Sequence, residues 1–351
     1  MASHDIRDLS PGQLRGTGCL TDVRPTNDNR DMSDSSQAKR HVRSSRRWAG
    51  ALAQGVVAAL VLVAVTGASV AAAPQEMTVV LIGDSYTSGN GAGAYRADDG
   101  SFRSTRNWGS VYADWLGTQG VQVNLVDLSH SGHNSAQVLA QVAKVPADAD
   151  LVMMTVGGND NSNFSNLVNK CFSVITANPS DCQARVDGTR ASLGDVMAST
   201  REILDALDAR LGPSARIVLV GYPLLSTDTS YVLTSGSNRY DAAAGIRGLQ
   251  ADVASRQIIL IATWNLNPAH VRATFVNTQA AFAGHEPDPS MTKRNPQRWI
   301  NEFFETEGKA GADGNVSSRV SVQPAEWYHP NITGHAQIAA LVQQTVGVPH
   351  Q

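Results

Sequence analysis

Residues 79–93, VVLIGDSYTSGNGAG, join an apolar run typical of a buried strand to a polar turn rich in glycine. Two chemistries begin in this way: a strand can present a serine nucleophile, or a glycine loop can bind the phosphates of a dinucleotide. Residues 89–94 (GNGAGA) fit the dinucleotide pattern G-x-G-x-x-[GA], but that pattern should begin where the strand ends, and Gly89 lies six residues past Gly83. We therefore interpret the stretch as a strand that ends in a candidate nucleophile, Ser85.

The rest of the sequence alternates short apolar runs with helical stretches. Strands are predicted from five apolar runs rich in β-branched residues, at 77–83, 121–128, 150–156, 216–221 and 272–276. Helices are predicted near 107–118, 135–143, 186–211, 238–262 and 334–346. This alternation predicts an α/β fold: a three-layer α/β/α sandwich around a mostly parallel, doubly wound, flavodoxin-like sheet of about five strands.

Two predicted connections are long, at 222–237 and 277–325. The second contains an apolar set spaced i, i+1, i+4, i+5, which predicts one face of a helix. Such a face can pack on the core, wall a pocket for an acyl chain or act as a lid, and packing on the core is favoured. The set consists of Trp299, Ile300, Phe303 and Phe304.

Composition indicates a globular protein that does not bind nucleic acid. Of the 351 residues, 42% are hydrophobic and 17% are charged, which is typical of a folded chain. Residues 1–47 carry nine Arg or Lys and six Asp, whereas the remaining 304 residues carry 19 basic and 25 acidic side chains. A mildly acidic body offers no basic face for phosphates, so nucleic acid is excluded as a partner.

The first 73 residues read as a targeting segment. Residues 1–47 are polar and aperiodic, which predicts a disordered leader, and translation that begins at Met32 is an alternative. Residues 48–73 follow a basic run and end in small residues, which is typical of a secretory signal peptide. The apolar part is also long enough to serve as an uncleaved membrane anchor. Both interpretations place residues 74–351, the predicted folded domain, outside the cytoplasm.

The cysteines fit an oxidising compartment. Cys19 lies in the leader, which leaves Cys171 and Cys182 as an even pair. A disulfide that closes so short a loop contributes on the order of 3 kcal/mol, and two unpaired buried thiols are the alternative. The sequence contains no CxxC or HExxH pattern, so neither a metal site nor a cofactor is predicted.

Residues with catalytic chemistry follow the predicted strands. Ser85 follows the first strand, Gly132 the second and Asn159 the third, while His329 precedes the last predicted helix. In an open α/β sheet, ligands bind at the carboxyl ends of the strands, where these residues would meet. Acyl transfer needs such a set: a hydroxyl, a base that takes its proton, and fixed donors for the developing oxyanion. Thr87 replaces the second glycine of G-x-S-x-G, so the turn differs from the nucleophile elbow of α/β-hydrolases.

Four blocks in this order resemble the SGNH hydrolases, also called the GDSL family of esterases and lipases. These blocks are GDSYTSG at 83–89, Gly132, GGND at 157–160, and HPNITGH at 329–335. The resemblance spans roughly residues 76 to 347 and is greatest to the secreted actinobacterial esterases and phospholipases of the family.

The resemblance implies a role for each of the four residues. Ser85 would be the nucleophile and its backbone N–H an oxyanion donor, Gly132 would donate its backbone N–H and Asn159 its side-chain amide. His329 would act as general base and then as general acid. Each residue also has an ordinary structural alternative: a helix cap for Ser85, a cap or Asx turn for Asn159, and a non-catalytic histidine for His329.

The acid of the triad is where this sequence departs from the family. The family usually has Asp three residues before the histidine, and here that position holds Glu326. Glutamate is one methylene longer and can still reach Nδ1 of His329, so we expect Glu326 to orient the histidine. A main-chain carbonyl near this position, as in some secreted relatives, is the alternative.

The sequence therefore predicts a secreted serine esterase or lipase that hydrolyses carboxylic esters of lipids or short-to-medium acyl chains through an acyl-enzyme. A carbohydrate O-acetyl esterase on the same fold and an inactive extracellular binding protein are the alternatives. The expected partner is a small-molecule or lipid ester. We further expect a monomer that makes transient contact with a membrane or lipid surface.

Overall fold

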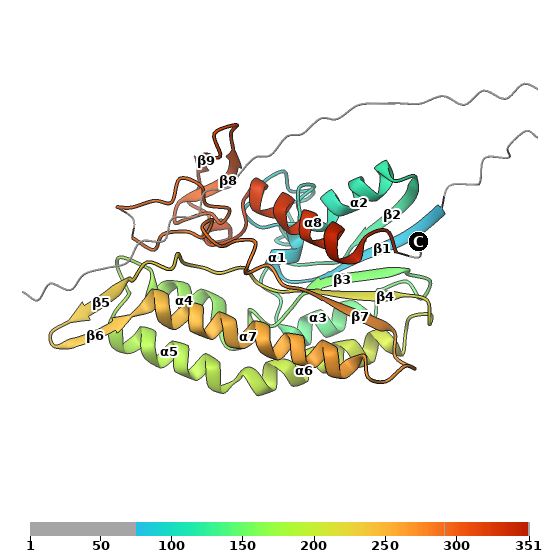
Figure 1. Cartoon of the computed structure of the whole chain (residues 1–351), viewed down its shortest axis with the longest axis horizontal. Coiled ribbons are helices and arrows are strands. Elements are labelled where there is room, and N and C mark those ends of the chain that lie inside the picture. Colours follow the sequence, from blue (N-terminus) through green and yellow to red (C-terminus); the bar gives the residue numbers. More distant parts are fainter. Residues whose placement is uncertain (1–74, 291, 350–351) are drawn as a thin grey trace, which may run out of the picture. The chain divides into compact units, whose positions relative to one another are not determined.

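The central sheet of the computed structural model is parallel and contains five strands (Figure 1). The structure describes residues 75–290 and 292–349, so the predicted leader and signal segment lie outside the described residues. The strands follow the order β2-β1-β3-β4-β7, and the chain reverses its winding between β1 and β3. Their bounds are β1 Gln75–Gly83, β2 Val121–Asp127, β3 Leu151–Thr155, β4 Arg216–Val220 and β7 Arg272–Val276. The predicted doubly wound α/β fold is confirmed.

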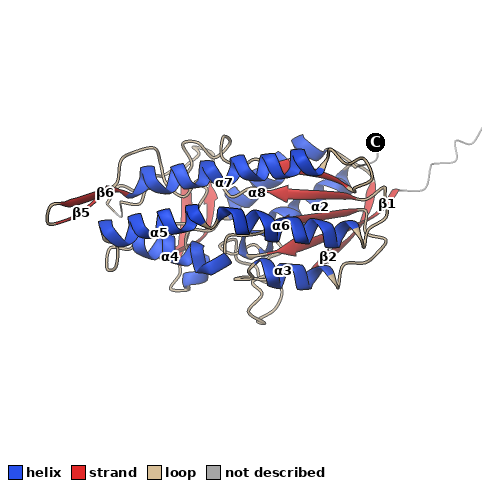
Figure 2. Cartoon of the chain, turned by 90° about the horizontal axis from the view of Figure 1, so that it is seen from below, coloured by secondary structure: helices blue, strands red, loops and turns tan. Residues whose placement is uncertain are grey.

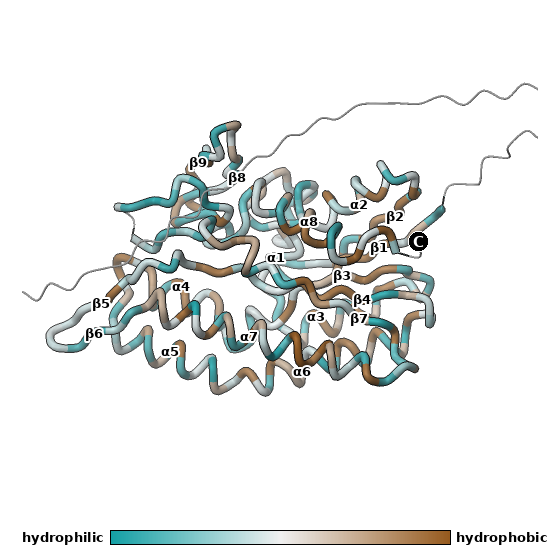
Figure 3. The backbone as a smooth tube through the Cα atoms, viewed as in Figure 1, coloured by the Kyte–Doolittle hydropathy of each residue, from teal (hydrophilic) through white to brown (hydrophobic). Residues whose placement is uncertain are grey.

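Both faces of this sheet are covered by helices, as its continuous apolar strands require. Alternate residues of β1 point to opposite faces: Val80 and Ile82 join the core beneath α3, α6 and α7, whereas Val79 and Leu81 join the core beneath α2 and α8. Figure 2 shows α3, α6 and α7 on one face, and Figure 3 shows hydrophobic colour along the central strands. Each fully buried aliphatic side chain contributes about 1.5–3 kcal/mol, so the two cores fix the register of the sheet.

Most helices begin at a side-chain cap. Asn134 starts α3 with a capping box that includes Gln137, and Asp241 and Asn331 cap α7 and α8. The α-helices are α1 Ser85–Ser88, α2 Trp108–Thr118, α3 Ser135–Val142, α4 Asn163–Cys171, α5 Pro179–Ala191, α6 Leu193–Asp208, α7 Ala242–Trp264 and α8 Ile332–Val346. Two short 3₁₀ helices, Asp160–Ser162 and Pro324–Glu326, precede α4 and α8.

The helix predicted over 186–211 is wrong in its extent. Two helices, α5 and α6, occupy this region and meet at Ser192, and α5 already begins at Pro179. Asn178 caps α5, and proline at the first helical position is the signal that marks this start. Helix α4 was not predicted, although Phe164, Leu167, Val168 and Cys171 recur at the helical spacing i, i+3, i+4, i+7 within a short and otherwise polar stretch.

Two antiparallel hairpins lie outside the main sheet. The first, β5 (Val232–Ser235) and β6 (Asn238–Asp241), occupies the start of the helix predicted over 238–262, so α7 begins at Ala242 instead. The second, β8 (Glu305–Ala310) and β9 (Val316–Val320), lies within the long connection 277–325.

The helix predicted from the apolar set at 299–304 is wrong. Trp299 stacks on His285 with ring centroids 3.7 Å apart, Ile300 forms a bridge to Pro330, and Phe304 has a φ of 63°. These side chains contact separate partners along an extended segment that contains a turn. Their helical spacing in the sequence therefore does not correspond to a helix. Ile300 and Phe303 are nevertheless buried, so their expected packing on the core is confirmed.

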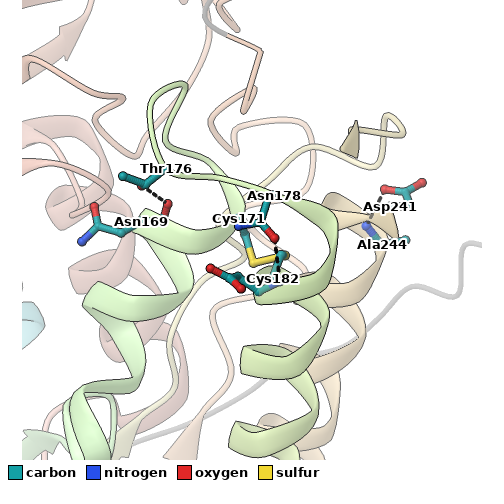
Figure 4. The surroundings of a disulfide bond; sticks show 8 residues. Asn169, Cys171, Thr176, Asn178, Cys182, Asp241 and Ala244 are labelled. Atoms are coloured by element: carbon teal, nitrogen blue, oxygen red, sulfur yellow. Dashed lines mark hydrogen bonds between the residues drawn. A yellow bond between two sulfur atoms is a disulfide. The ribbon is translucent and has the colours of Figure 1, made fainter. Parts of the chain in front are cut away.

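A disulfide joins Cys171 at the end of α4 to Cys182 in the first turn of α5 (Figure 4). The predicted pairing is confirmed. Within the loop that it closes, the hydroxyl of Thr176 donates to the carbonyl of Asn169 at 2.8 Å. The covalent link thus holds together two helices of the face that carries α6 and α7.

Candidate active site

The first two candidate residues meet at the carboxyl edge of the sheet. Ser85 is the first residue of α1 and is separated from β1 by Asp84 alone, and His329 lies just before α8. Nε2 of His329 is 2.8 Å from Oγ of Ser85, although 244 residues separate them in sequence. Both side chains are buried. Asp84 caps α1 by accepting from the N–H of Tyr86. Ser85 is therefore not the helix cap that was the alternative to a nucleophile.

The turn that presents Ser85 depends on glycine. Gly83 has a φ of 123°, which side chains disfavour, and a Cβ there would lie 2.5 Å from the carbonyl oxygen of Thr155. Its backbone is held from the other side by Gln141, whose carboxamide accepts from the N–H of Gly83 and donates to its carbonyl. The end of β1 is therefore fixed immediately before the serine.

The other nitrogen of His329 is bound by the main chain. Nδ1 lies 2.9 Å from the carbonyl oxygen of Trp327. Because a carbonyl can only accept, Nδ1 carries the proton and Nε2 offers its lone pair to the hydroxyl of Ser85. This is the tautomer that a general base needs.

The prediction that Glu326 orients His329 is wrong in this geometry. The Glu326 carboxylate accepts from the hydroxyl of Tyr95 at 2.7 Å and from the hydroxyl of Ser321. Glu326 ends a 3₁₀ helix, and Tyr328 takes a φ of 56°, so the chain turns sharply between Glu326 and the histidine. The turn directs the carbonyl of Trp327 to Nδ1, which is the alternative considered from the sequence.

The surroundings of His329 keep it neutral. Its ring lies against Tyr86 and Phe164, with centroids 4.9 Å apart in each case. Burial disfavours the charged form and lowers the pKa of His329 to about 3, although the bond to Trp327 opposes this shift. The imidazole is therefore unprotonated at neutral pH and can accept a proton.

The two candidate oxyanion residues lie on loops that follow the strands on either side of β1. Gly132 follows β2 and has a φ of 77°, and Asn159 follows β3. The Asn159 amide donates to the carbonyl of His133 at 3.1 Å. The Asp160 carboxylate accepts from both the N–H and the hydroxyl of Ser135, at 2.7 Å each. These bonds tie the Asn159 loop to the Gly132 loop.

Asp84 anchors the segment beneath the serine. Its carboxylate accepts from the hydroxyl of Thr155 at 2.7 Å and from the hydroxyl of Tyr222, as well as from Tyr86. Burial raises the pKa of Asp84 to about 6, while these hydrogen bonds oppose the shift. Sequence reasoning missed Tyr222, which lies in the loop after β4 and gives no motif signal.

An apolar cavity of about 90 Å³ opens beside this group. Tyr86, Phe164 and Tyr222 line it near His329, and residues of helices α4 to α7 and of neighbouring loops line the rest. The α6 and α7 residues are Leu193, Val196, Leu249, Gln250, Val253, Ala254 and Gln257. Within the described ranges, no three His, Cys, Asp or Glu side chains gather as metal ligands would.

Known proteins resemble this chain in sequence and in fold. The chain matches the model of the GDSL-like lipase/acylhydrolase family over residues 81–337. A lipase from Streptomyces rimosus is 31% identical over 254 residues, which cover 70% of this chain and 86% of that protein. The match confirms the family expected from the four sequence blocks.

Two solved structures have a similar fold, each with a TM-score of 0.57. One is an extracellular lipase from Streptomyces rimosus, 24% identical, with 75% of this chain and 98% of that chain covered. The other is phospholipase A1 from Streptomyces albidoflavus NA297, 21% identical, with 77% and 99% covered. This chain thus belongs to the GDSL-like lipase/acylhydrolase family, and it is a carboxylic ester hydrolase.

Proposed function

We propose that Ser85 is the nucleophile of this hydrolase and that His329 is its general base. The observation that carries the proposal is the 2.8 Å contact between Oγ of Ser85 and Nε2 of His329. The carbonyl of Trp327 supports it by fixing the proton on Nδ1. An inactive binding protein has no need of a buried, correctly protonated pair, so that alternative is less well supported.

The reaction proceeds through an acyl-enzyme. Oγ of Ser85 attacks the ester carbonyl carbon while its proton moves to Nε2 of His329. The imidazolium then gives this proton to the leaving alkoxide, and the C–O bond breaks to release the alcohol. A water molecule attacks the acyl-enzyme with the same histidine as base, and the acid leaves as Ser85 regains its proton.

Three N–H groups would stabilise the tetrahedral oxyanion: the backbone N–H groups of Ser85 and Gly132 and the side-chain amide of Asn159. The bond from Asn159 to His133 supports this role, because it uses one amide hydrogen and leaves the second to donate. Loss of one such donor typically lowers turnover by about 100- to 1000-fold.

The cavity favours an aliphatic acyl chain as the acid part of the ester. Tyr86 and Phe164 contact His329 and also line the cavity, so an acyl group on Ser85 has an apolar space beside it. Burial of each methylene contributes about 0.8 kcal/mol, a gain that a sugar acetate would forgo. We therefore propose lipid or medium-chain esters as substrates over O-acetylated carbohydrates.

We also propose that the enzyme is secreted and works at lipid surfaces. The apolar segment before residue 74 and the extracellular relative from Streptomyces rimosus support secretion. Within the described ranges, no helix has the length and apolar character to cross a membrane. Phe304, Val320 and Val322 are exposed, and Phe304 packs on Trp327, next to the catalytic histidine loop, so they offer an apolar contact with lipid.

Hydrolysis of p-nitrophenyl esters by the purified protein tests the proposal. Ser85→Ala should abolish turnover, whereas Ser237→Ala, at an exposed hairpin turn, should leave it unchanged. Full activity of the Ser85→Ala protein would mean that another nucleophile acts. A panel that includes phospholipids and acetylated sugars then separates the substrate classes.

A further inference from the structure

His133 closes the turn that contains Gly132. Its N–H donates to the carbonyl of His130 at 3.3 Å, and Gly132, with a φ of 77°, lies within this turn. A Cβ on Gly132 would meet no atom of the described chain within 4 Å apart from its chain neighbours. The N–H of His130 donates to the carbonyl of Gly83 at 3.0 Å, which joins the turn to the end of β1. The direction of the Gly132 N–H therefore depends on how the two histidines are held.

The side chain of His133 is bound by Gln141 of α3. Nε2 of Gln141 lies 2.8 Å from Nδ1 of His133 and 3.0 Å from the carbonyl oxygen of Gly83. The amide has only one orientation, because its Oε1 accepts from the N–H of Gly83 at 2.6 Å. Its nitrogen therefore donates one hydrogen to each partner, and Nδ1 of His133 accepts. The proton of the neutral imidazole is thus on Nε2.

Three parts of the proposed site converge on His133. Gln141 connects its ring to the end of β1, two residues before Ser85. Its carbonyl accepts from the side-chain amide of Asn159 at 3.1 Å. Gly132 directly precedes it in the chain. A displacement of His133 would therefore move two of the three proposed oxyanion donors relative to the serine.

Protonation of His133 is incompatible with this arrangement. An imidazolium carries a hydrogen on Nδ1, which would point at the N–H of Gln141 that now donates to it. The ring of His133 also stacks on that of His130, with centroids 4.2 Å apart and planes 10° apart. The loop after β3 contributes the Asp160 carboxylate, but two donors at the start of α3 already bind it. Burial, the neighbouring His130 and the Lys144 ammonium lower the pKa of His133.

We propose that His133 is a positioning residue for the oxyanion donors and that its neutral form, bound to Gln141, is required for full turnover. The inference rests on the proposed function, because it takes Gly132 and Asn159 as donors. When His133 gains a proton, the bond from Gln141 breaks and the turn around Gly132 loses its support. Turnover then falls at a pH where His329, whose pKa is about 3, is still a neutral base. His133 thus sets the acidic limit of turnover.

The test is the pH dependence of kcat for an ethyl ester, with the released ethanol measured by gas chromatography so that neither substrate nor readout titrates. His133→Leu should lower kcat at about pH 8 by about tenfold to 100-fold with little change in KM, since misplaced donors stabilise the oxyanion less. His133→Asn offers Oδ1 as an acceptor to Gln141 and gains no proton in this range. It should restore kcat to near the wild-type value and move the midpoint of the acid limb down by about one pH unit or more.

His270→Leu is the matched control. Its ring also stacks on a neighbour, with centroids 4.0 Å from Trp264, and it lies just before β7, at the opposite edge of the sheet from Ser85. This variant should leave kcat and the acid limb unchanged. Thermal unfolding of each variant verifies that it is folded, and His133→Asn carries the test by itself if His133→Leu does not fold.

The outcomes separate this inference from the proposed function. If Ser85→Ala retains activity, the proposed nucleophile is wrong. If Ser85→Ala is inactive but His133→Leu keeps the wild-type kcat, only the role of His133 is wrong, whether or not KM rises. An acid limb that is unchanged in His133→Asn would mean that another group titrates, such as Asp84 with its pKa of about 6, and would overturn the proposal.

Discussion

The hydroxyl of Tyr222 hydrogen-bonds to the carboxylate of Asp84 and accepts the backbone N–H of Gly158 at 3.0 Å. One side chain thereby joins the residue before Ser85 to the residue before Asn159. This hydroxyl holds together the loop that carries the proposed nucleophile and the loop that carries Asn159, a proposed oxyanion donor.

Replacement of Tyr222 by phenylalanine should therefore reduce turnover more than substrate binding. The change leaves the Gly158 N–H without a partner and removes one donor from Asp84, at a cost of about 1–3 kcal/mol. We expect kcat to fall by about tenfold or more with little change in KM, since small misplacement of catalytic groups is costly. Tyr112→Phe is the matched control, because it loses a similar bond to the carbonyl of Gly347 far from the serine. Equal losses of kcat in both variants would contradict a positioning role for Tyr222.

Glu326→Gln should have a modest effect on turnover, because the carboxylate binds Tyr95 and Ser321 and not His329. A conventional triad acid would cost about 10⁴-fold when converted to the amide. We expect less than about a tenfold change in kcat together with a lower melting temperature, since a buried charge-assisted hydrogen bond is weakened. Steady-state kinetics beside thermal unfolding separate the two effects. A decrease in kcat as large as that of His329→Ala would contradict this expectation and would indicate that Glu326 orients His329.

His329 should not titrate in the range of an ordinary histidine. Its pKa of about 3 means that the folded protein binds no proton there between about pH 6.5 and 3, whereas the unfolded chain does. The unfolded state then holds more protons, so the contribution of His329 to stability decreases as pH falls through this window. NMR of histidine-labelled protein from pH 8 downward provides the measurement, with His329→Gln to assign the resonance. A midpoint near 6.5 would show a solvated imidazole and contradict the buried base.

Removal of the disulfide should destabilise the fold without impairing the chemistry. Cys171→Ser with Cys182→Ser frees the loop between α4 and α5 and should lower the free energy of unfolding by about 2–4 kcal/mol. Phe164, which packs on His329, lies in the first turn of α4, at the opposite end from Cys171. We therefore expect kcat at room temperature to stay near the wild-type value while denaturant unfolding shifts to lower concentration. If the double mutant were folded but inactive, the loop between α4 and α5 would have to contribute to the active site.

The sequence predicts the main sheet because its strands are buried on both faces and read as continuous apolar runs. Ser85 and His329 could be proposed for a related reason: each follows or precedes an element whose end the pattern marks. The apolar set at 299–304 misled because spacing alone cannot distinguish a helix from a turned segment whose side chains meet separate partners. Tyr222 carries no local signal, since its importance comes from contacts with two loops that are distant in sequence.

The carbonyl of Trp327, which orients His329, is a group that every amino acid at that position would supply. No substitution of a single side chain can delete it, so we expect a mutational scan to identify the proposed nucleophile and the proposed base but no third partner. The left-handed backbone conformation of Tyr328 places this carbonyl at Nδ1 of His329. The backbone thus binds the imidazole where, in a conventional triad, an acidic side chain would. An engineer who inserted an aspartate to complete the triad would be adding a charge to a position that is already filled.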